Sequence, residues 1–254
     1  VLDTNRTWNE YTYEDQVDDY RQTHYQLLFD QRIGNDATLN ITAFRVLGNG
    51  FFEQYREEDD MAFYGITPAV INGDTLSTTD LVRRRWLDNT LDGVNASFER
   101  RIGTHRWVVG GSYSVYDGDH FGEVIWARYS GSRDKDDRYY ANDSRKTDAN
   151  AYGKLTYALT PRIDLFGDVQ VRNVTHDFLG YDGDLRNVTQ SVAFTFFNPK
   201  VGLSWKVDEH HRVYGSAAIA NREPNRDDLT ETSPESRPTS ERMLDIELGF
   251  ERRA

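Results

Sequence analysis

The chain has 254 residues, a formal net charge of −12 and no Cys. The absence of Cys excludes disulfide scaffolds, thiol nucleophiles and thiolate metal sites. The acidic charge disfavours nucleic acid as a partner, because nucleic-acid binding needs a basic surface, and no apolar run approaches the roughly eighteen residues of a membrane helix.

Alternation of apolar and polar residues predicts about nine β-strands along the chain. Trp107, Val109, Tyr113 and Val115, for example, alternate with small or polar residues. Such a period of two is typical of a strand, since successive side chains leave opposite faces of the pleat. The predicted strands cover roughly residues 18–32, 37–47, 86–101, 106–117, 146–159, 163–175, 195–207, 212–222 and 240–252.

The connections between these strands are of two kinds. Short turns lie at 33–36, 102–105, 160–162 and 208–211, whereas longer connections with many acidic and aromatic residues lie at 48–84, 118–145, 176–194 and 223–239. An outer-membrane barrel has short turns at its periplasmic rim and larger loops at its external rim. The sequence therefore predicts an all-β fold, an antiparallel transmembrane β-barrel segment, with periplasmic turns and external loops.

A soluble carbohydrate-binding β-sandwich is the alternative fold. It would bury the apolar strand faces against a second sheet and would use strands of roughly five or six residues. The predicted strands are longer, and their apolar stripes begin or end with rings such as Trp107, Tyr157, Trp205 and Phe250, as at a membrane interface. Burial of Trp107, Val109 and Tyr113 against a second sheet would make the barrel prediction wrong.

The two ends of the chain indicate an incomplete barrel. Residues 1–20 are polar and aromatic without a strand of their own, and we interpret them as the tail of an external loop. The last predicted strand has no following partner. Because an odd number of strands with unpaired edges does not close a barrel, we expect residues 1–254 to be a segment of a larger one.

Several motifs resemble those of TonB-dependent outer-membrane receptors, especially the receptors of Bacteroidetes-type bacteria. They are YRQTHYQL at 20–27, RRRWLDN at 83–89, YDGDHFGEVIWARY at 116–129, FFNPKVGL at 196–203 and ANREPNRDD at 220–228. The resemblance spans nearly the whole chain. It implies that residues 1–254 are part of a barrel of roughly 22 strands, from which the family's plug, TonB box, first strands and last strands are absent.

The resemblance also implies a function, which is active transport across the outer membrane of a Gram-negative bacterium. External loops and the lumen would bind a scarce solute, first of all a ferric siderophore or similar iron chelate, with cobalamin or an oligosaccharide as alternatives. The implied partners are TonB, through the missing plug region, the small-molecule or oligosaccharide ligand, and outer-membrane lipid and lipopolysaccharide. A passive porin-type barrel would share the strands and lack the plug.

The sequence gives no support to an enzyme. It contains no phosphate-binding glycine loop, no His-Glu-x-x-His pair and no Gly-x-Ser-x-Gly elbow, so we predict no catalytic residue, no cofactor and no metal site. Asp117, Asp119, His120 and Glu123 have groups that Ca²⁺ accepts, but they lack the complete calcium-loop pattern. We expect them to form hydrogen bonds within a loop.

Arg83, Arg84 and Arg85 form the densest basic cluster of the chain. Guanidinium groups bind carboxylate and phosphate in bidentate fashion, so the cluster suits an anionic chelate or a lipopolysaccharide phosphate; pairing with nearby acidic residues is the alternative. Alternation predicts that Arg83 and Arg85 share a face, with Arg84 opposite. Position and chemistry give the candidate ligand contacts, which are Arg83, Arg85, Trp86, His120 and Trp126.

Two further groups have structural interpretations. Opposite charges alternate near the end of a predicted strand at Arg222, Glu223, Arg226 and Asp227, and we predict a charge network there that fixes the loop above the strand or orients the plug. The aromatic and acidic residues of 51–64 form either a ligand vestibule or an ordered loop whose rings pack on one another.

Overall fold

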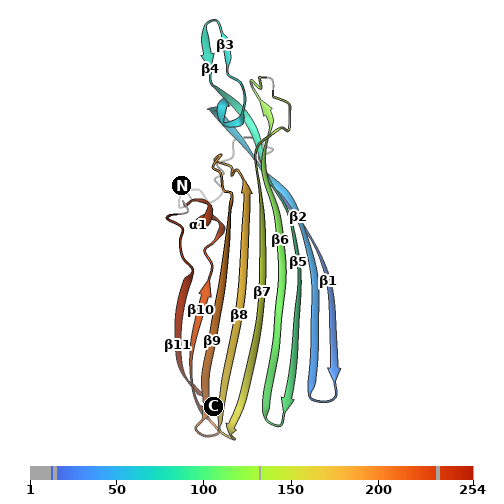
Figure 1. The fold of residues 1–254 in the computed structure, drawn as a ribbon, viewed down its shortest axis with the longest axis vertical. Coiled ribbons are helices and arrows are strands. Elements are labelled where there is room, and N and C mark those ends of the chain that lie inside the picture. Colours follow the sequence, from blue (N-terminus) through green and yellow to red (C-terminus); the bar gives the residue numbers. More distant parts are fainter. Residues whose placement is uncertain (1–12, 14–15, 132, 233–234, 254) are drawn as a thin grey trace.

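The computed structural model describes residues 13, 16–131, 133–232 and 235–253. Nine strands form one antiparallel sheet in chain order, curved like the wall of a barrel (Figure 1), as the sequence predicts. The strands of this sheet are β1 (Asp18–Ile33), β2 (Ala37–Asp60), β5 (Thr78–Ile102), β6 (His105–Ala127), β7 (Arg138–Thr160), β8 (Ile163–Gly180), β9 (Gln190–Lys206), β10 (His211–Arg222) and β11 (Glu241–Arg252).

The predicted short turns all lie at one end of the sheet, the lower end in Figure 1. Gly34 and Gly103 have φ values of 64° and 62°, a left-handed conformation that glycine adopts without a steric penalty. In the other two turns, Thr160 Oγ1 accepts from the backbone N–H groups of residues 162 and 163, and Asp208 accepts from those of residues 210 and 211. The predicted asymmetry of the two rims is confirmed.

One face of the sheet is apolar and exposed. Trp107, Val109 and Tyr113 are 46%, 52% and 50% exposed, so no second sheet within the described residues covers them, and the sandwich alternative is wrong. On β6 this apolar band ends at Val115, since the next exterior residue is Asp117. A band of apolar residues on alternate positions suits contact with lipid, which would leave the parts of the strands above it outside the bilayer.

The opposite face, which we call the lumenal face, carries aromatic rings laid over glycines. In each case the glycine and the ring belong to paired strands, and a Cβ added to the glycine would lie less than 3 Å from the ring. A side chain at those positions would therefore lift the ring from the sheet. These pairs are Phe44 with Gly93, Tyr152 with Gly110, Phe166 with Gly202, and Tyr214 with Gly249.

The strands extend further from the turns than the sequence predicts. Residues 48–60, 78–84, 118–127, 138–145, 176–180 and 190–194 were expected in external loops and belong to strands instead. Above the apolar band, polar, aromatic and apolar residues occur on both faces, so alternation no longer marks a strand there. Register shifts occur between Arg56 and Asp59 of β2, between Val82 and Arg83 of β5, and between Gly122 and Glu123 of β6.

Beyond these extensions the chain forms a small apolar core and a projecting hairpin. The 3-10 helix η1 (Met61–Tyr64) is capped by Asp60, whose side chain accepts from the N–H of residue 62. Met61 and Tyr64 pack with Ile66, Leu81 and Val124. The strands β3 (Ala69–Ile71) and β4 (Asp74–Leu76) form the hairpin through Asn72-Gly73, both at positive φ, as a tight hairpin turn requires.

The segment between β10 and β11 folds back and packs against the outer ends of β8 and β9. Its helix α1 (Arg226–Thr230) has a capping box between Asn225 and Asp228. Leu229 is buried against Phe178 and Val192, and Gln190 Nε2 donates to the Leu229 carbonyl at 2.7 Å. No helix in the described residues is long and apolar enough to cross a membrane.

At the edges of the sheet, β1 pairs with β2 and β11 pairs with β10, and neither has a second partner within the described residues. Of the segment interpreted as a loop tail, Asp18–Tyr20 belong to β1, while residues 1–12 and 14–15 lie outside the described residues.

Candidate functional site

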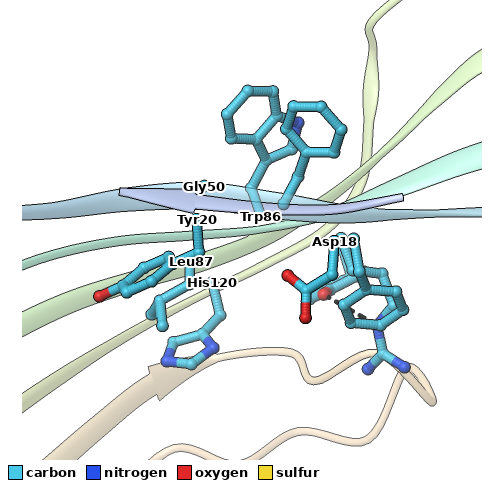
Figure 2. Close-up of a pocket in the computed structure, with 10 residues that line it drawn as sticks. Asp18, Tyr20, Gly50, Trp86, Leu87 and His120 are labelled. Carbon is cyan, nitrogen blue, oxygen red and sulfur yellow. Dashed lines mark hydrogen bonds between the residues drawn. The ribbon is translucent and has the colours of Figure 1, made fainter. Parts of the chain in front are cut away.

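A cavity of about 480 Å³ lies near the outer ends of β1, β2, β5, β6 and β7 (Figure 2). The strand register places one residue of each of three neighbouring strands in a lumenal row, with Gly50 beside Leu87 and Leu87 beside His120. Figure 2 shows Tyr20, Leu87 and His120 on one side of the strands and Trp86 on the other. The lumenal part of the cavity is lined by Asp18, Tyr20, Gly50, Phe52, Arg85, Leu87, His120 and Tyr140.

Arg85 is the central cation of this cavity. Its guanidinium lies 5.6 Å from the centre of the Phe52 ring and 5.5 Å from that of Tyr140, and its Nε donates to the Tyr140 hydroxyl at 3.2 Å. Burial opposes the charged form, but the hydrogen bond with Tyr140 leaves the pKa of Arg85 raised. No salt bridge to Arg85 is formed within the described residues. A cation framed by rings and without a carboxylate partner suits an anionic ligand.

The neighbouring arginines are already occupied by protein groups. Arg84 forms a salt bridge with Glu53 at 2.6 Å and lies 4.2 Å from the centre of the Phe51 ring. Arg83 donates to Gln54 Oε1 at 2.9 Å and to the Tyr64 hydroxyl at 3.0 Å. Because Phe51 and Phe52 are successive strand residues, their contacts with Arg84 and Arg85 place these two arginines on opposite faces, as alternation predicts.

His120 faces the cavity from β6. Burial, followed by the nearby cations of Arg226 and Arg85, lowers the pKa of His120 to about 4, so the imidazole is neutral at pH 7. A neutral imidazole has one ring nitrogen that donates and one that accepts. The site thus offers a ligand the Arg85 cation, a neutral hydrogen-bonding ring and, at its β1 side, the Asp18 carboxylate.

Of the other predicted contacts, Trp86 lines the cavity from the exterior face, whereas Arg83 and Trp126 are not among its lining residues. Trp86 lies on the exterior face, where its ring centre is 4.6 Å from that of Phe51 and 5.9 Å from that of Phe121, and its Nε1 donates to Glu123 at 2.9 Å. Trp126 is exposed at the outer end of β6 and pairs with Val82. Of the five candidate contacts, the structure therefore brings only Arg85 and His120 together in the lumenal part of the cavity.

The possible calcium ligands are dispersed by the same alternation. Asp117, Asp119, His120 and Glu123 lie in β6, and not in a loop as expected. His120 faces the lumen, whereas Asp117 and Asp119 face the exterior. Nowhere in the described residues do three or more side chains of His, Cys, Asp or Glu gather as a metal site would require.

The predicted charge network is divided among separate contacts. Glu223 accepts from Lys146 at 2.8 Å and from Arg172 at 2.8 Å. Burial favours its neutral form, but the hydrogen bonds from Lys146 and Arg172 prevail and lower the pKa of Glu223 to about 2. Arg222 instead pairs with Glu241, Arg226 donates to Asn142 Oδ1, and Asp227 lies in the first turn of α1. Glu223 thus ties the segment after β10 to β7 and β8 by ion pairs.

Sequence reasoning missed Tyr20 and Tyr140 and did not single out Phe52. The register explains their position, since Phe52 pairs with Arg85 and Gly122 pairs with both Arg85 and Tyr140. Alternation reveals which residues of one strand share a face, but it does not reveal which residue of the next strand lies beside them. The aromatic residues of 51–64 divide accordingly, because Phe52 lines the cavity while Phe63 and Tyr64 pack on each other at 5.1 Å between ring centres.

Comparison with known proteins places this wall within larger barrels. The sequence matches the family described as TonB dependent receptor-like, beta-barrel, over residues 1–251. No curated protein matches it in sequence. Among solved structures, the chain is similar to the ferric-catecholate import receptor Fiu from E. coli K12 in its closed form, with 13% identity and a TM-score of 0.66 over 95% of this chain and 39% of that one.

Two further solved structures have the same fold. The copper transporter OprC shares 12% identity with a TM-score of 0.68, over 92% of this chain and 37% of its own. The siderophore receptor PiuA from Acinetobacter baumannii shares 14% identity with a TM-score of 0.65, over 92% of this chain and 38% of its own. The chain therefore spans well under half the length of each of these structures.

Proposed function

The chain belongs to the family of TonB-dependent receptor β-barrels, and from this premise we propose that it forms part of an outer-membrane receptor that binds and imports a ferric siderophore or similar iron chelate. Members of this family are outer-membrane barrels of transport receptors. The names of Fiu and PiuA refer to iron chelates, and that of OprC to copper. Proteins of this fold thus bind different solutes, and the residues of the site must indicate which solute this receptor binds.

The observation that carries the proposal is the environment of Arg85. Its guanidinium lies between two aromatic rings, lacks a salt bridge within the described residues and borders an open cavity. Iron chelates with catecholate or carboxylate arms are bulky anions, and those with aromatic arms also present flat rings. Arg85 supplies a cation for the anionic arms, while Phe52, Tyr140 and Tyr20 supply surfaces on which rings stack. Few polar groups in a largely aromatic pocket are typical of a small-molecule site.

The binding test compares two neighbouring arginines. In the full-length receptor on intact cells, Arg85→Gln is expected to weaken binding of radiolabelled ferric dihydroxybenzoate about tenfold or more, because a hydrogen bond to a charged group contributes roughly 1.5–3 kcal/mol. Arg84→Gln is the matched control and is expected to change the Kd less than about twofold, because the Arg84 guanidinium lies on the exterior face, where it pairs with Glu53. Equal effects of the two substitutions, or no binding by wild-type cells, would contradict the proposal.

We propose TonB as the energy-coupling partner, acting through parts of the receptor outside residues 1–254. A site that holds a dilute solute tightly releases it slowly, because most differences in affinity lie in the dissociation rate, so import needs an energy input. Uptake of ferric dihydroxybenzoate is expected to stop in a strain without TonB while binding to the cell surface persists. Unchanged uptake in that strain would instead indicate the passive porin-type alternative.

A further inference from the structure

We propose that the imported solute moves along the lumenal face of β2, β5 and β6, which forms an uncharged path from the cavity toward the periplasmic turns. The path consists of every second residue in 38–50 of β2, 87–97 of β5 and 108–120 of β6. This inference rests on the proposed function, because it assigns a route to the solute that the cavity binds.

The middle of the path is a row of amide and hydroxyl groups. The register aligns Thr42, Asn95, Ser112 and Asn150 across four strands, and Asn150 Nδ2 donates to the Ser112 hydroxyl. A hollow of about 260 Å³ lies at this height, lined in part by these four residues. Its walls therefore offer hydrogen-bonding groups without a formal charge.

The path is continuous with the candidate site. Gly50, Leu87 and His120 belong both to the cavity and to the upper end of the path, so a solute leaving Arg85 meets these side chains first. Directly below them the register aligns Gly48, Asn89 and Gly118. At its lower end the path stops at the salt bridge between Arg106 and Glu99, where the distance is 2.6 Å.

The adjoining wall of β7, β8 and β9 differs in charge. Its lumenal face carries ion pairs at the same heights, among them Arg172 with Asp148 at 2.5 Å and Lys154 with Asp168 at 3.2 Å. Lysine and arginine there would hold an anionic chelate, and aspartate would repel it. Passage through a pore requires binding that is favourable enough to enter and weak enough to leave. The uncharged wall meets that requirement and the charged wall does not.

A glycine allows the Phe44 ring to lie flat against the wall of the path. Phe44 lies against Gly93 on the lumenal face, where a Cβ would come within 2.3 Å of the ring. The glycine thus lets an aromatic ring lie along the wall and not across the lumen, which keeps the hollow below it open. A segment of the receptor that fills the lumen is the other possible occupant of this surface, and the experiment below distinguishes it from a moving solute.

Asn95 and Gln170 provide a matched pair for the test. Both are lumenal amides at a similar height above their turns, Asn95 in the path and Gln170 in the charged wall, where it accepts from Asn198 at 3.1 Å. Asn95→Asp and Gln170→Glu each replace an amide by a carboxylate of the same shape. In the full-length receptor, both are expected to bind ferric dihydroxybenzoate with a Kd within about twofold of wild type, since neither touches the cavity.

Import then separates the two variants. Under saturating ferric dihydroxybenzoate, Asn95→Asp is expected to lower the import rate about tenfold or more by like-charge repulsion, whereas Gln170→Glu and the neutral Asn95→Ser keep near wild-type rates. Wild-type import by Asn95→Asp, or an equal loss in Gln170→Glu, would overturn the path. If wild-type cells bind no chelate, the proposed function fails and the path with it. If Asn95→Asp binds the chelate and imports it at the wild-type rate, the proposed path is wrong while the proposed function stands.

A second variant introduces the charge only after the receptor has folded, so a folding defect cannot explain a loss of import. The chain contains no Cys, so Ser112→Cys introduces one reactive thiol that is modified after the receptor has reached the membrane. A sulfonate-bearing reagent is expected to lower import, while a methyl-transferring reagent of similar reactivity leaves it unchanged. Equal inhibition by both reagents would indicate a surface that packs against a fixed segment of the receptor and would overturn the proposal.

Discussion

Replacing Gly93 by Ala tests how the aromatic rings are held on the lumenal face. A Cβ at this position would lie 2.3 Å from Cζ of Phe44 and 2.8 Å and 2.9 Å from its two Cε atoms. Contacts of these lengths are not tolerated, so the ring must swing away from the sheet or the two strands must separate. Either response replaces a packed ring face by a strained or partly empty arrangement.

The expected loss of folding free energy is about 1–3 kcal/mol, the usual cost of inserting a methyl group into a packed site. Gly153 in β7 is the matched control, because an added Cβ there meets nothing within 4 Å. Gly153→Ala removes conformational freedom from the unfolded chain without a clash and is expected to be neutral or stabilising by about 0.4–1 kcal/mol. The same substitution is thus expected to destabilise the fold at Gly93 and not at Gly153.

The measurement is reversible urea unfolding of the full-length receptor in lipid vesicles, followed by tryptophan fluorescence. Adding Phe44→Ala to Gly93→Ala is expected to recover part of the loss, since the two residues touch and the coupling of contacting residues reaches about 0.5–3 kcal/mol. Equal stability of Gly93→Ala and Gly153→Ala would refute the steric argument, as would a double variant whose losses simply add.

Two further predictions concern the segment between β10 and β11. The pKa of Glu223 is about 2 against an ordinary value of 4.5, so its ion pairs with Lys146 and Arg172 stabilise the fold fully above pH 4.5 and are lost as the pH falls toward 2; Glu223→Gln should flatten this part of the pH–stability profile, and an unchanged profile would contradict the assignment. Leu229→Ala should cost about 2–5 kcal/mol of local stability, measured as faster proteolysis within 223–240 at native conditions, whereas exposed Leu248→Ala should leave cleavage there unchanged.

The strands in the membrane and their turns could be predicted from the sequence because lipid imposes a strict pattern. Trp107, Val109 and Tyr113 must alternate with lumenal residues wherever one face meets hydrocarbon. Above the band that constraint ends. Phe51 and Phe52 then lie on opposite faces although both are aromatic, which makes a paired strand resemble a loop in the sequence.

The candidate site could be predicted only in part, and the bulges give the physical reason. His120 and Trp126 are six residues apart in β6 and would lie on the same face of a regular strand. The register passes from Arg83–Val124 to Val82–Trp126, which leaves Ile125 unpaired and turns Trp126 to the exterior side. A similar shift on β7 leaves the residue before Tyr140 unpaired. Sequence alternation alone does not show where such an extra residue is inserted.

Those bulges also bear on how receptors of this shape diversify. Three of the four register shifts, at Arg56, Val82 and Gly122, lie above the apolar band, and the fourth, at Ala158, adjoins a turn. Between them, within the bilayer, an inserted residue would turn polar lumenal side chains toward lipid, and in β7 and β8 it would turn charged ones such as Lys154 and Asp168. In the outer extensions, one inserted or deleted codon exchanges lumenal and exterior side chains without altering the barrel below. A lineage can thus replace the chemistry of its ligand site through changes in length as readily as through substitution.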